Sequence, residues 1–371
     1  MRRPALVTGA GRVVYAGSMT TTLEDSAARA ALAAAIANRI GASAVAITSA
    51  TRLAGGAVQE NWRIDTTVEG GPRAGTHTWV VRTDARALIP LSLDRETEAK
   101  VLAAAHLAGV KVAQPIATSG EDGALGKSYV VQNWIEGTAQ ARRIVRDPTL
   151  PEHGPPLARE LAAELARIHG IAPPCHGLAA LPLPLLTPAR AEVARLRAAL
   201  TKAGEPRPAL EYILYWLDQH APPVRQLALV HGDFRTGNYM VRDGRLTGIL
   251  DWEFAHWGDP DEDIGWLTAR CWRFGNDDLE TGGIAPLGVF LDAYAAASGR
   301  QVHLDAVRYW QIMGAAKWAT VAVLQGDRFR LGGEASLELA LTGLMPAEME
   351  HDALTDVLAW GRAPKGGPKW Q

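Results

Sequence analysis

Two short polar segments between apolar runs contain the residue types that phosphoryl transfer needs. The first, HGDFRTGN (residues 231–238), places Asp233 five residues before Asn238. A carboxylate can accept the proton of a hydroxyl nucleophile, and an amide oxygen can ligate a hard cation such as Mg²⁺. The second, GILDWEF (residues 248–254), puts Asp251 at the end of a strand-like run, where it could bind the same ion. Together these groups predict kinase-type chemistry, which depends mainly on positioning and charge stabilisation. Either segment alone would more often be an ordinary turn.

The elements that must position these residues fall into two parts. Residues 23–40 are Ala-rich and helical in pattern, ending before Gly41. The remainder of the first part predicts five strands, with one helix inserted after the third. The strand-like runs are two within residues 45–70, then 76–84, 113–119 and 127–134, and the inserted helix is 93–109. This order predicts a small α+β lobe.

Long helical patterns dominate after Gly137, at residues 157–170, 188–204, 208–220 and 306–325. The proline-rich segment 172–188 predicts a loop. We therefore expect a β-rich, nucleotide-binding lobe over 19–136 and a helical lobe over 137–371 that carries the catalytic and metal-binding loops and the acceptor site. Residues 1–18 are expected to be a disordered leader. Their Gly9 and Gly11 resemble a dinucleotide fingerprint, but no βαβ unit can be built around them, and Met19 is the more natural beginning.

Composition excludes several classes of function. The net charge of −2, without a strong block of either sign, argues against a nucleic-acid or anionic-membrane surface. The sequence contains no run of about 18 apolar residues, so no transmembrane helix is predicted. Cys175 and Cys271 match no metal-ligand spacing, which favours reduced thiols in the cytoplasm. Nothing in the composition specifies an oligomeric state.

The two segments, together with GDPDEDIGWL (residues 258–267), resemble the aminoglycoside phosphotransferase superfamily, whose fold is protein-kinase-like. The resemblance covers nearly the whole chain after Met19. It implies a two-lobed α+β fold, ATP and Mg²⁺ as cofactors, Asp233 as catalytic base, and Asn238 and Asp251 as metal ligands.

The resemblance also implies supporting roles around the catalytic residues. His231 would be structural, and Asp263 would brace the catalytic loop through backbone hydrogen bonds. Glu253 is open between a water-mediated metal role and a structural one.

The nucleotide-binding residues depart from the kinase pattern. Where kinase-like folds place a Lys on the third strand, this sequence has Arg82, which keeps the charge but changes the geometry. Its expected partner is Glu98 rather than Glu96, because Glu98 lies on the same side of the helix as Val101 and Leu102.

Two further segments complete the expected nucleotide site. Gly55 and Gly56 lie where a phosphate-covering turn is expected, although a Gly-Gly pair is usually only a hairpin turn. Residues Gln132, Asn133, Trp134 and Ile135 would form the hinge between the lobes and present backbone groups to adenine.

The acceptor is less defined. An aminoglycoside kinase should have an acid-rich acceptor region, whereas residues 317–354 are apolar with Lys317, Arg328 and Arg330 interspersed. This tail resembles the superfamily branch that is fused to acyl-CoA dehydrogenases, which implies a hydroxyacyl-CoA or related hydroxy acid as acceptor. The basic residues could instead simply extend over a helical core. An aminoglycoside or macrolide kinase and a non-catalytic nucleotide-binding module stay open as alternatives.

Overall fold

The computed structural model describes residues 22–53, 59–84, 92–120, 123–332 and 336–360. The expected leader over residues 1–18 and the Gly55–Gly56 turn lie outside these ranges. The chain divides into two compact units. The first comprises the residues up to 90, with 94–99 and 115–134, and the second comprises 91–93, 100–114 and 135–371.

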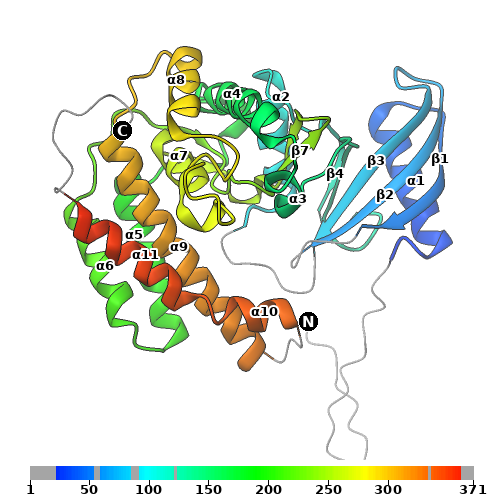
Figure 1. Cartoon of the computed structure of the whole chain (residues 1–371). Helices are drawn as coiled ribbons and strands as arrows, with labels where there is room; N and C mark the ends of the chain where they lie inside the picture. Colours follow the sequence, from blue (N-terminus) through cyan, green and yellow to red (C-terminus); the bar gives the residue numbers. More distant parts are fainter. Residues whose placement is uncertain (1–21, 54–58, 85–91, 121–122, 333–335, 361–371) are drawn as a thin grey trace, which may run out of the picture. The chain divides into compact units, whose positions relative to one another are not determined.

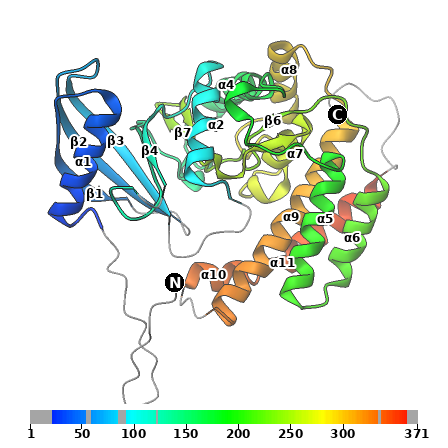
Figure 2. The same cartoon turned by 180° about the vertical axis from the view of Figure 1, so that it is seen from behind.

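The first unit is a five-stranded antiparallel sheet with the strand order β1-β2-β3-β5-β4. One helix, α1, lies along a face of this sheet (Figures 1 and 2). Leu32 and Ile36 of α1 pack with Trp62, Ile64 and Trp79 of the sheet into one buried cluster. The elements are α1 (Ser26–Ile40), β1 (Ala44–Arg52), β2 (Gln59–Glu69), β3 (Gly75–Asp84), α2 (Arg95–Leu107), β4 (Pro115–Ser119) and β5 (Tyr129–Asn133). The predicted five strands and the helix inserted after the third are confirmed.

The two units are not contiguous segments divided at residue 136, as predicted, because helix α2 is shared between them. Its first turn belongs to the first unit, whereas the residues from Lys100 onward belong to the second. The physical reason is the apolar stripe of Val101, Leu102 and Ala105, which is buried in the core of the second unit. The chain leaves the first unit between Trp134 and Ile135.

The second unit is mainly helical (Figure 1). Its helices are α3 (Ala141–Val145), α4 (Leu150–His169), α5 (Pro188–Ala203), α6 (Pro208–Gln219), α7 (Pro260–Thr268), α8 (Leu287–Ser298), α9 (Leu304–Arg330), α10 (Leu337–Thr342) and α11 (Pro346–Ala359), with short 3₁₀ turns η1 (His176–Leu178), η2 (Trp252–Phe254) and η3 (Arg270–Trp272). Helix α4 begins earlier than the predicted residue 157. Pro151 is tolerated in its first turn because no intrahelical donor is needed there.

Two antiparallel strand pairs frame the polar segments of the second unit. They are β6 (Ala228–Val230) with β9 (His256–Gly258), and β7 (Tyr239–Arg242) with β8 (Arg245–Ile249). The β7–β8 hairpin turns through Asp243 and Gly244, both at positive φ, as a tight two-residue turn requires. In the described part of the chain, no helix is long and apolar enough to cross a bilayer.

Candidate active site

The segment 231–238 forms a loop between β6 and β7, and its side chains alternate between buried and partly exposed positions. Phe234 and Thr236 are buried, with 1% and 0% of their surfaces exposed, and they anchor the loop in the unit. The side chains of Asp233 and Arg235 keep 16% and 26% exposure. Gly232 has a φ of 77°, and a Cβ there would lie 2.3 Å from the Phe254 carbonyl oxygen. The loop is therefore anchored by two buried side chains, one apolar and one a hydrogen-bonded hydroxyl, while it presents a carboxylate and a guanidinium.

The Asp233 carboxylate is held by three side chains. Its Oδ1 accepts hydrogen bonds from Trp266 Nε1 at 2.7 Å and from Arg235 Nε at 3.2 Å. Its Oδ2 accepts from Asn238 Nδ2 at 2.5 Å, and the same nitrogen donates to the Asp233 carbonyl at 2.9 Å. Because the Asn238 nitrogen faces Asp233, its Oδ1 is turned away from that carboxylate and can serve a cation. The predicted base and the first predicted metal ligand are thus adjacent.

Asp251, the second predicted metal ligand, directly follows Leu250, which the loop of residues 231–238 holds on both sides. The Leu250 N–H donates to the Asn238 carbonyl at 2.8 Å, and the Leu250 carbonyl accepts from His231 Nε2 at 2.8 Å. Asp251 itself has φ 58° and ψ 63°, in the left-handed region. A residue with a Cβ costs about 1–3 kcal/mol in such a conformation, and these conformations cluster at functional sites.

His231 supports the loop in a defined tautomer. Its Nδ1 accepts from the Asp233 N–H at 3.2 Å, so the proton on the ring must be on Nε2, which donates to Leu250. The ring is fully buried, and this burial lowers the pKa of His231, so the neutral form is favoured. The structural role predicted for His231 agrees with these contacts.

Asp263 braces the start of the same loop. Its two carboxylate oxygens accept the backbone N–H groups of His231 and Gly232 at 2.7 and 2.9 Å, and it also contacts His169 Nε2 at 3.1 Å. Burial alone would raise the pKa of Asp263, but the hydrogen bond with His169 and the further contacts with His169 and His231 hold it below the ordinary value. The backbone bracing predicted from the sequence is therefore present.

The sequence alone assigned no role at this site to three residues that the structure places there, namely Arg235, Trp266 and Lys317. Arg235 contacts Asp233, and its guanidinium carbon lies 4.3 Å from the ring centroid of Trp272. Trp266 donates to Asp233, and the Nζ of Lys317 lies 4.7 Å from the Trp266 ring centroid. The proximity of Arg235 in the sequence could have indicated its contact. Lys317 lies too far along the chain for any local signal.

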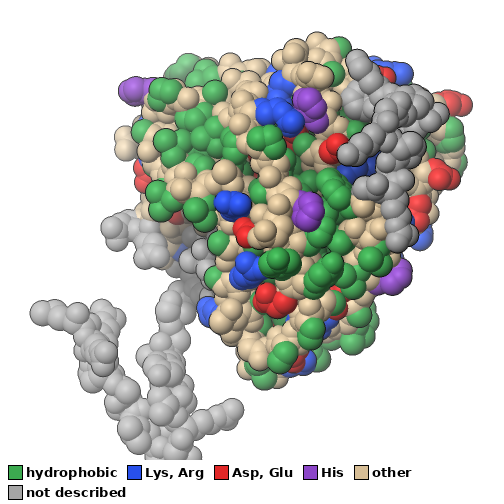
Figure 3. All heavy atoms as spheres, turned by 90° about the vertical axis from the view of Figure 1, so that its left-hand side faces the viewer, with side chains coloured by type: hydrophobic (Ala, Val, Ile, Leu, Met, Phe, Trp, Pro, Cys, Tyr) green, Lys and Arg blue, Asp and Glu red, His purple; other side chains and the backbone are tan. Residues whose placement is uncertain are grey.

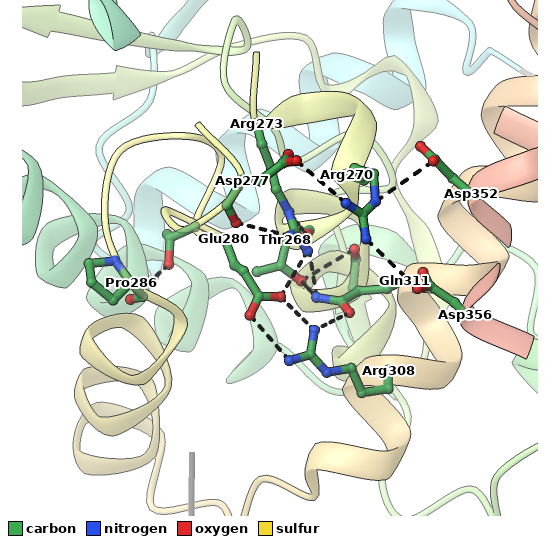
Figure 4. A network of polar contacts seen from close by, with 12 residues as sticks. Thr268, Arg270, Arg273, Asp277, Glu280, Pro286, Arg308, Gln311, Asp352 and Asp356 are labelled. Atoms are coloured by element: carbon green, nitrogen blue, oxygen red, sulfur yellow. Dashed lines mark hydrogen bonds and ion pairs between the residues drawn. The ribbon is translucent and has the colours of Figure 1, made fainter. Parts of the chain in front are cut away.

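The segment that carries Trp272 is fixed by a polar network (Figure 4). Glu280 accepts from Arg273 at 2.8 Å and from Arg308 at 3.1 Å, so it links this segment to α9. Gln311 of α9 donates to the Thr268 hydroxyl at 2.8 Å. Arg270 extends the network to carboxylates at 3.5–4.0 Å, namely Asp277, Asp352 and Asp356. The network holds the aromatic ring against which Arg235 rests.

The basic residues of the tail do not form one patch. Lys317 donates to the Gly232 carbonyl at 2.7 Å, at the catalytic loop. Arg330 pairs with Glu205 at 2.9 Å and with Asp327 at 2.6 Å. Arg328 lies 11 residues after Lys317 on α9, which is about 16 Å along a helix. Of these three basic residues, Lys317 contacts the loop of residues 231–238.

In the first unit, Arg82 and Glu98 form a buried ion pair. Arg82 Nη1 donates to Glu98 Oε1 at 2.7 Å, and the two residues are 4% and 0% exposed. Arg95, three residues before Glu98, also donates to this carboxylate and is 3% exposed. Arg82 lies on β3, an interior strand of the sheet, so it is not an exposed edge residue. The set carries two guanidinium charges and one carboxylate.

The residues expected at the hinge follow directly from β5. Gln132 and Asn133 pair with Val80 and Trp79 of β3. The Trp134 N–H donates to the Thr78 carbonyl at 3.2 Å, so this amide is used within the sheet. Ile135 is the first residue beyond the division between the units. Adenine would therefore have to use other backbone groups of this segment.

The residues present fit a magnesium ion that shares its ligands with a nucleotide. Within the described ranges, no group of three or more His, Cys, Asp or Glu residues could hold a metal by itself. Mg²⁺ usually takes one or two carboxylates and completes its shell with water and phosphate oxygens. Asn238 Oδ1 and the Asp251 carboxylate supply such a partial set.

Comparison with known proteins relates the chain to one family. The model of the family described as "Phosphotransferase enzyme family" matches residues 49–310. Acyl-CoA dehydrogenase family member 10 from Mus musculus is 25% identical over 305 residues, which cover 76% of this chain and 26% of that protein. The chain thus spans about a quarter of the length of this relative.

Solved structures show the same fold. A protein from Ralstonia eutropha JMP134, described as an aminoglycoside phosphotransferase, superposes with a TM-score of 0.70 at 20% identity, covering 88% of this chain and 97% of that one. A thermostable mutant of aminoglycoside phosphotransferase APH(4)-Ia, solved with AMP-PNP and hygromycin B, gives a TM-score of 0.53 at 13% identity, covering 89% and 99%. The predicted kinase-like α+β fold is therefore confirmed.

Proposed function

Because the chain belongs to the phosphotransferase enzyme family, we propose that it transfers the γ-phosphoryl group of ATP to the hydroxyl of a small molecule, with Mg²⁺ as cofactor. The observation that carries this proposal is the arrangement of Asp233 beside Asn238, with Asp251 next to a residue that both His231 and Asn238 hold. Base and metal ligands are thereby set in one loop cluster of the second unit.

Asp233 would act as the general base. The acceptor oxygen forms a bond to the γ-phosphorus while the bond from that phosphorus to the β–γ bridging oxygen breaks, and ADP leaves. The proton of the acceptor hydroxyl passes to the Asp233 carboxylate. Trp266 and Arg235 hold Oδ1 by hydrogen bonds, so the orientation of the carboxylate is fixed before the acceptor binds.

Asn238 and Asp251 would hold Mg²⁺. When bound, the ion supplies charge neutralisation on the β- and γ-phosphates. The left-handed backbone of Asp251 supports this role, because a strained backbone beside the rigidly held Leu250 is typical of a functional position.

On the first unit, we propose that Arg82 contacts the nucleotide phosphates. Arg95 adds a second guanidinium to the shared Glu98 carboxylate, and guanidinium groups match the geometry of phosphate oxygens. Glu98 would orient Arg82. Gly55 and Gly56 would cover the phosphates, and the backbone of residues 132–135 would receive adenine.

The favoured acceptor is a hydroxyacyl-CoA or a related hydroxy acid. Support comes from the relative named for acyl-CoA dehydrogenases and from Lys317, whose positive charge beside Asp233 would repel a polycation. On the face that carries α6 and α11, the acidic side chains of the described residues are dispersed and form no acidic patch (Figure 3). An aminoglycoside acceptor is the second candidate, favoured by the likeness to APH(4)-Ia. We place the reaction in the cytoplasm, where Cys175 and Cys271 would stay free thiols as in the structure.

The test is phosphate transfer from γ-labelled ATP with Mg²⁺, across hydroxyacyl-CoAs, free hydroxy acids, aminoglycosides and macrolides. We expect label on a member of the first two classes. The matched control is Asp233→Asn, which should lower turnover about 10²–10⁴-fold while nucleotide binding is retained. A fall of less than tenfold would contradict the base assignment. Label on an antibiotic would select the second candidate, and binding of ATP without transfer to any acceptor would favour a non-catalytic module.

A further inference from the structure

Lys317 occupies a position next to the reacting carboxylate. Its Nζ donates to the carbonyl of Gly232, the residue before Asp233, at 2.7 Å. The same ammonium lies 4.7 Å from the centroid of the Trp266 ring, whose N–H donates to Asp233. One indole ring therefore has the base at its edge and the ammonium over its face.

Three carboxylates of this neighbourhood each have a cation of their own. Asp233 pairs with Arg235 at 3.2 Å. Glu192 of α5 is buried and accepts from Arg195 Nε at 2.6 Å. Glu262 of α7 pairs with His256 at 3.3 Å. Among the residues that the structure describes, none offers Lys317 a carboxylate within 4.0 Å, so its direct contacts are a carbonyl oxygen and a ring face, while Glu192 attracts its charge from farther away.

His256 supplies a second positive charge, and that charge and the charge of Lys317 repel each other. Its Nδ1 faces the Phe254 carbonyl at 2.9 Å and its Nε2 faces Glu262 Oε2 at 3.3 Å. Both partners only accept hydrogen bonds, so both ring nitrogens must carry protons. Burial disfavours this charge, but Glu262 outweighs burial and raises the pKa of His256 to about 9, while Lys317 opposes it by repulsion. The imidazole side chain is 43% exposed.

One oxygen in the same cluster has no partner. Glu262 uses Oε2 for His256, whereas its Oε1 is buried and makes no hydrogen bond with any residue of the described ranges. A buried, unsatisfied oxygen costs stability. A donor such as water or a hydroxyl group would satisfy this oxygen, whereas an anionic group would not.

We infer that Lys317, with His256 beside it, binds an anionic group of the acceptor and thereby selects anionic hydroxy compounds over neutral and polycationic ones. This inference rests on the proposed function, because it assigns these residues to the acceptor of the same reaction. The anion could be the carboxylate of a free hydroxy acid or a phosphate of a CoA thioester. Both sources share the charged oxygen that an ammonium recognises.

The experiment measures equilibrium binding of acceptor analogues that differ in charge, with and without Mg·AMP-PNP. 3-Hydroxybutyrate is paired with neutral 1,3-butanediol, and 3-hydroxybutyryl-CoA is paired with the pantetheine thioester, which lacks phosphates. Hygromycin B is the polycation. The variants are Lys317→Met, Lys317→Arg and His256→Gln, and Lys202→Met, an exposed lysine on α5, is the matched control.

We expect the wild-type chain to bind the anionic member of at least one pair about 10- to 100-fold more tightly, the range of a charge-assisted hydrogen bond. Lys317→Met should abolish that preference, Lys317→Arg should keep most of it, His256→Gln should reduce it, and Lys202→Met should leave it unchanged. The pair that shows the preference identifies the carboxylate or the phosphate as the source.

Three outcomes would overturn the inference. The wild-type chain could bind anionic and neutral members equally, Lys317→Met could weaken both members equally, or it could weaken Mg·AMP-PNP instead, which would assign Lys317 to the donor phosphate. Failure of the proposed function is a separate result. It would appear as absent Mg·AMP-PNP binding in the wild-type chain, while the titrations without nucleotide still decide the role of Lys317.

Discussion

The two charged centres of this chain are built in opposite ways. In the first unit, Arg82, Arg95 and Glu98 are almost completely buried and bind one another. In the second unit, Asp233 and Arg235 keep part of their surfaces exposed on a loop whose anchors are other residues. Buried charges depend on their partners for stability, whereas exposed charges on a braced loop can be changed with little effect on folding. The comparison predicts which substitutions unfold the chain and which only disable it.

The largest effect on stability should come from Glu98→Ala. It leaves two buried guanidinium groups without the carboxylate they share, which typically costs about 3–5 kcal/mol. Denaturant unfolding, followed by tryptophan fluorescence, measures this loss. Glu96→Gln changes an exposed acid on the same helix and should change stability by less than about 0.5 kcal/mol. Equal losses in the two variants would remove the distinction between the two centres.

Asp251 tests the comparison at a residue where the needs of function and of stability should differ. Asp251→Gly and Asp251→Ala both remove the carboxylate, and both should weaken Mg²⁺-dependent nucleotide binding. Only the glycine variant relieves the left-handed backbone, so it should be more stable than the alanine variant by about 1–2 kcal/mol. Thermal unfolding of the two variants side by side gives this difference. Unchanged affinity for ATP·Mg²⁺ would count against the metal role.

Trp272 tests whether the second centre depends on its aromatic support. Trp272→Leu removes the buried ring face under Arg235, an interaction worth about 0.5–1 kcal/mol because the guanidinium side chain is partly exposed. We expect a two- to fivefold fall in kcat/KM for phosphoryl transfer. Trp360→Leu is the control, because Trp360 packs against Trp216 away from the loop. A similar fall in both variants would mean that general packing, not support of Arg235, was lost.

The smallest effect concerns pH. The pKa of His256 is raised to about 9 in the folded chain, because Glu262 outweighs burial, whereas an unfolded histidine titrates near 6.5. Its stabilising contribution is therefore complete below about pH 6.5 and is lost as the pH rises through 9. Since the side chain is 43% exposed, the total should stay under about 1 kcal/mol. Urea unfolding at pH 6 and pH 9 should show a smaller loss in His256→Gln than in the wild-type chain.

Local pattern predicted the five-stranded sheet with its inserted helix and the proximity of Asp233 and Asn238, and its limits are physical. Glu98 was distinguished from Glu96 because helix periodicity places it with Val101 and Leu102, and the Arg82–Glu98 pair is present. Arg95 was missed although it lies one turn before Glu98, because nothing local shows that an arginine is buried. Asp233 and Asn238 share one short loop, so their proximity followed from the sequence.

Contacts between distant segments could not be predicted in this way. Lys317 reaches Gly232 across 85 residues. The residues around Lys317 in the sequence indicated only that this tail is apolar with basic residues interspersed. Trp266 was visible within its motif, but the direction of its indole depends on how α7 packs on α9. Side-chain direction at such positions is set by tertiary packing, which a single sequence does not specify.

Helix α2 has a consequence for how this chain can be divided. Its first turn holds Glu98 for the first unit, and its later turns bury Val101, Leu102 and Ala105 in the core of the second. A fragment ending at Trp134 would carry these three apolar side chains without the core that covers them, and should aggregate. The first unit is therefore not a portable module. Chimeras with relatives should exchange α2 together with its packing partners in both units.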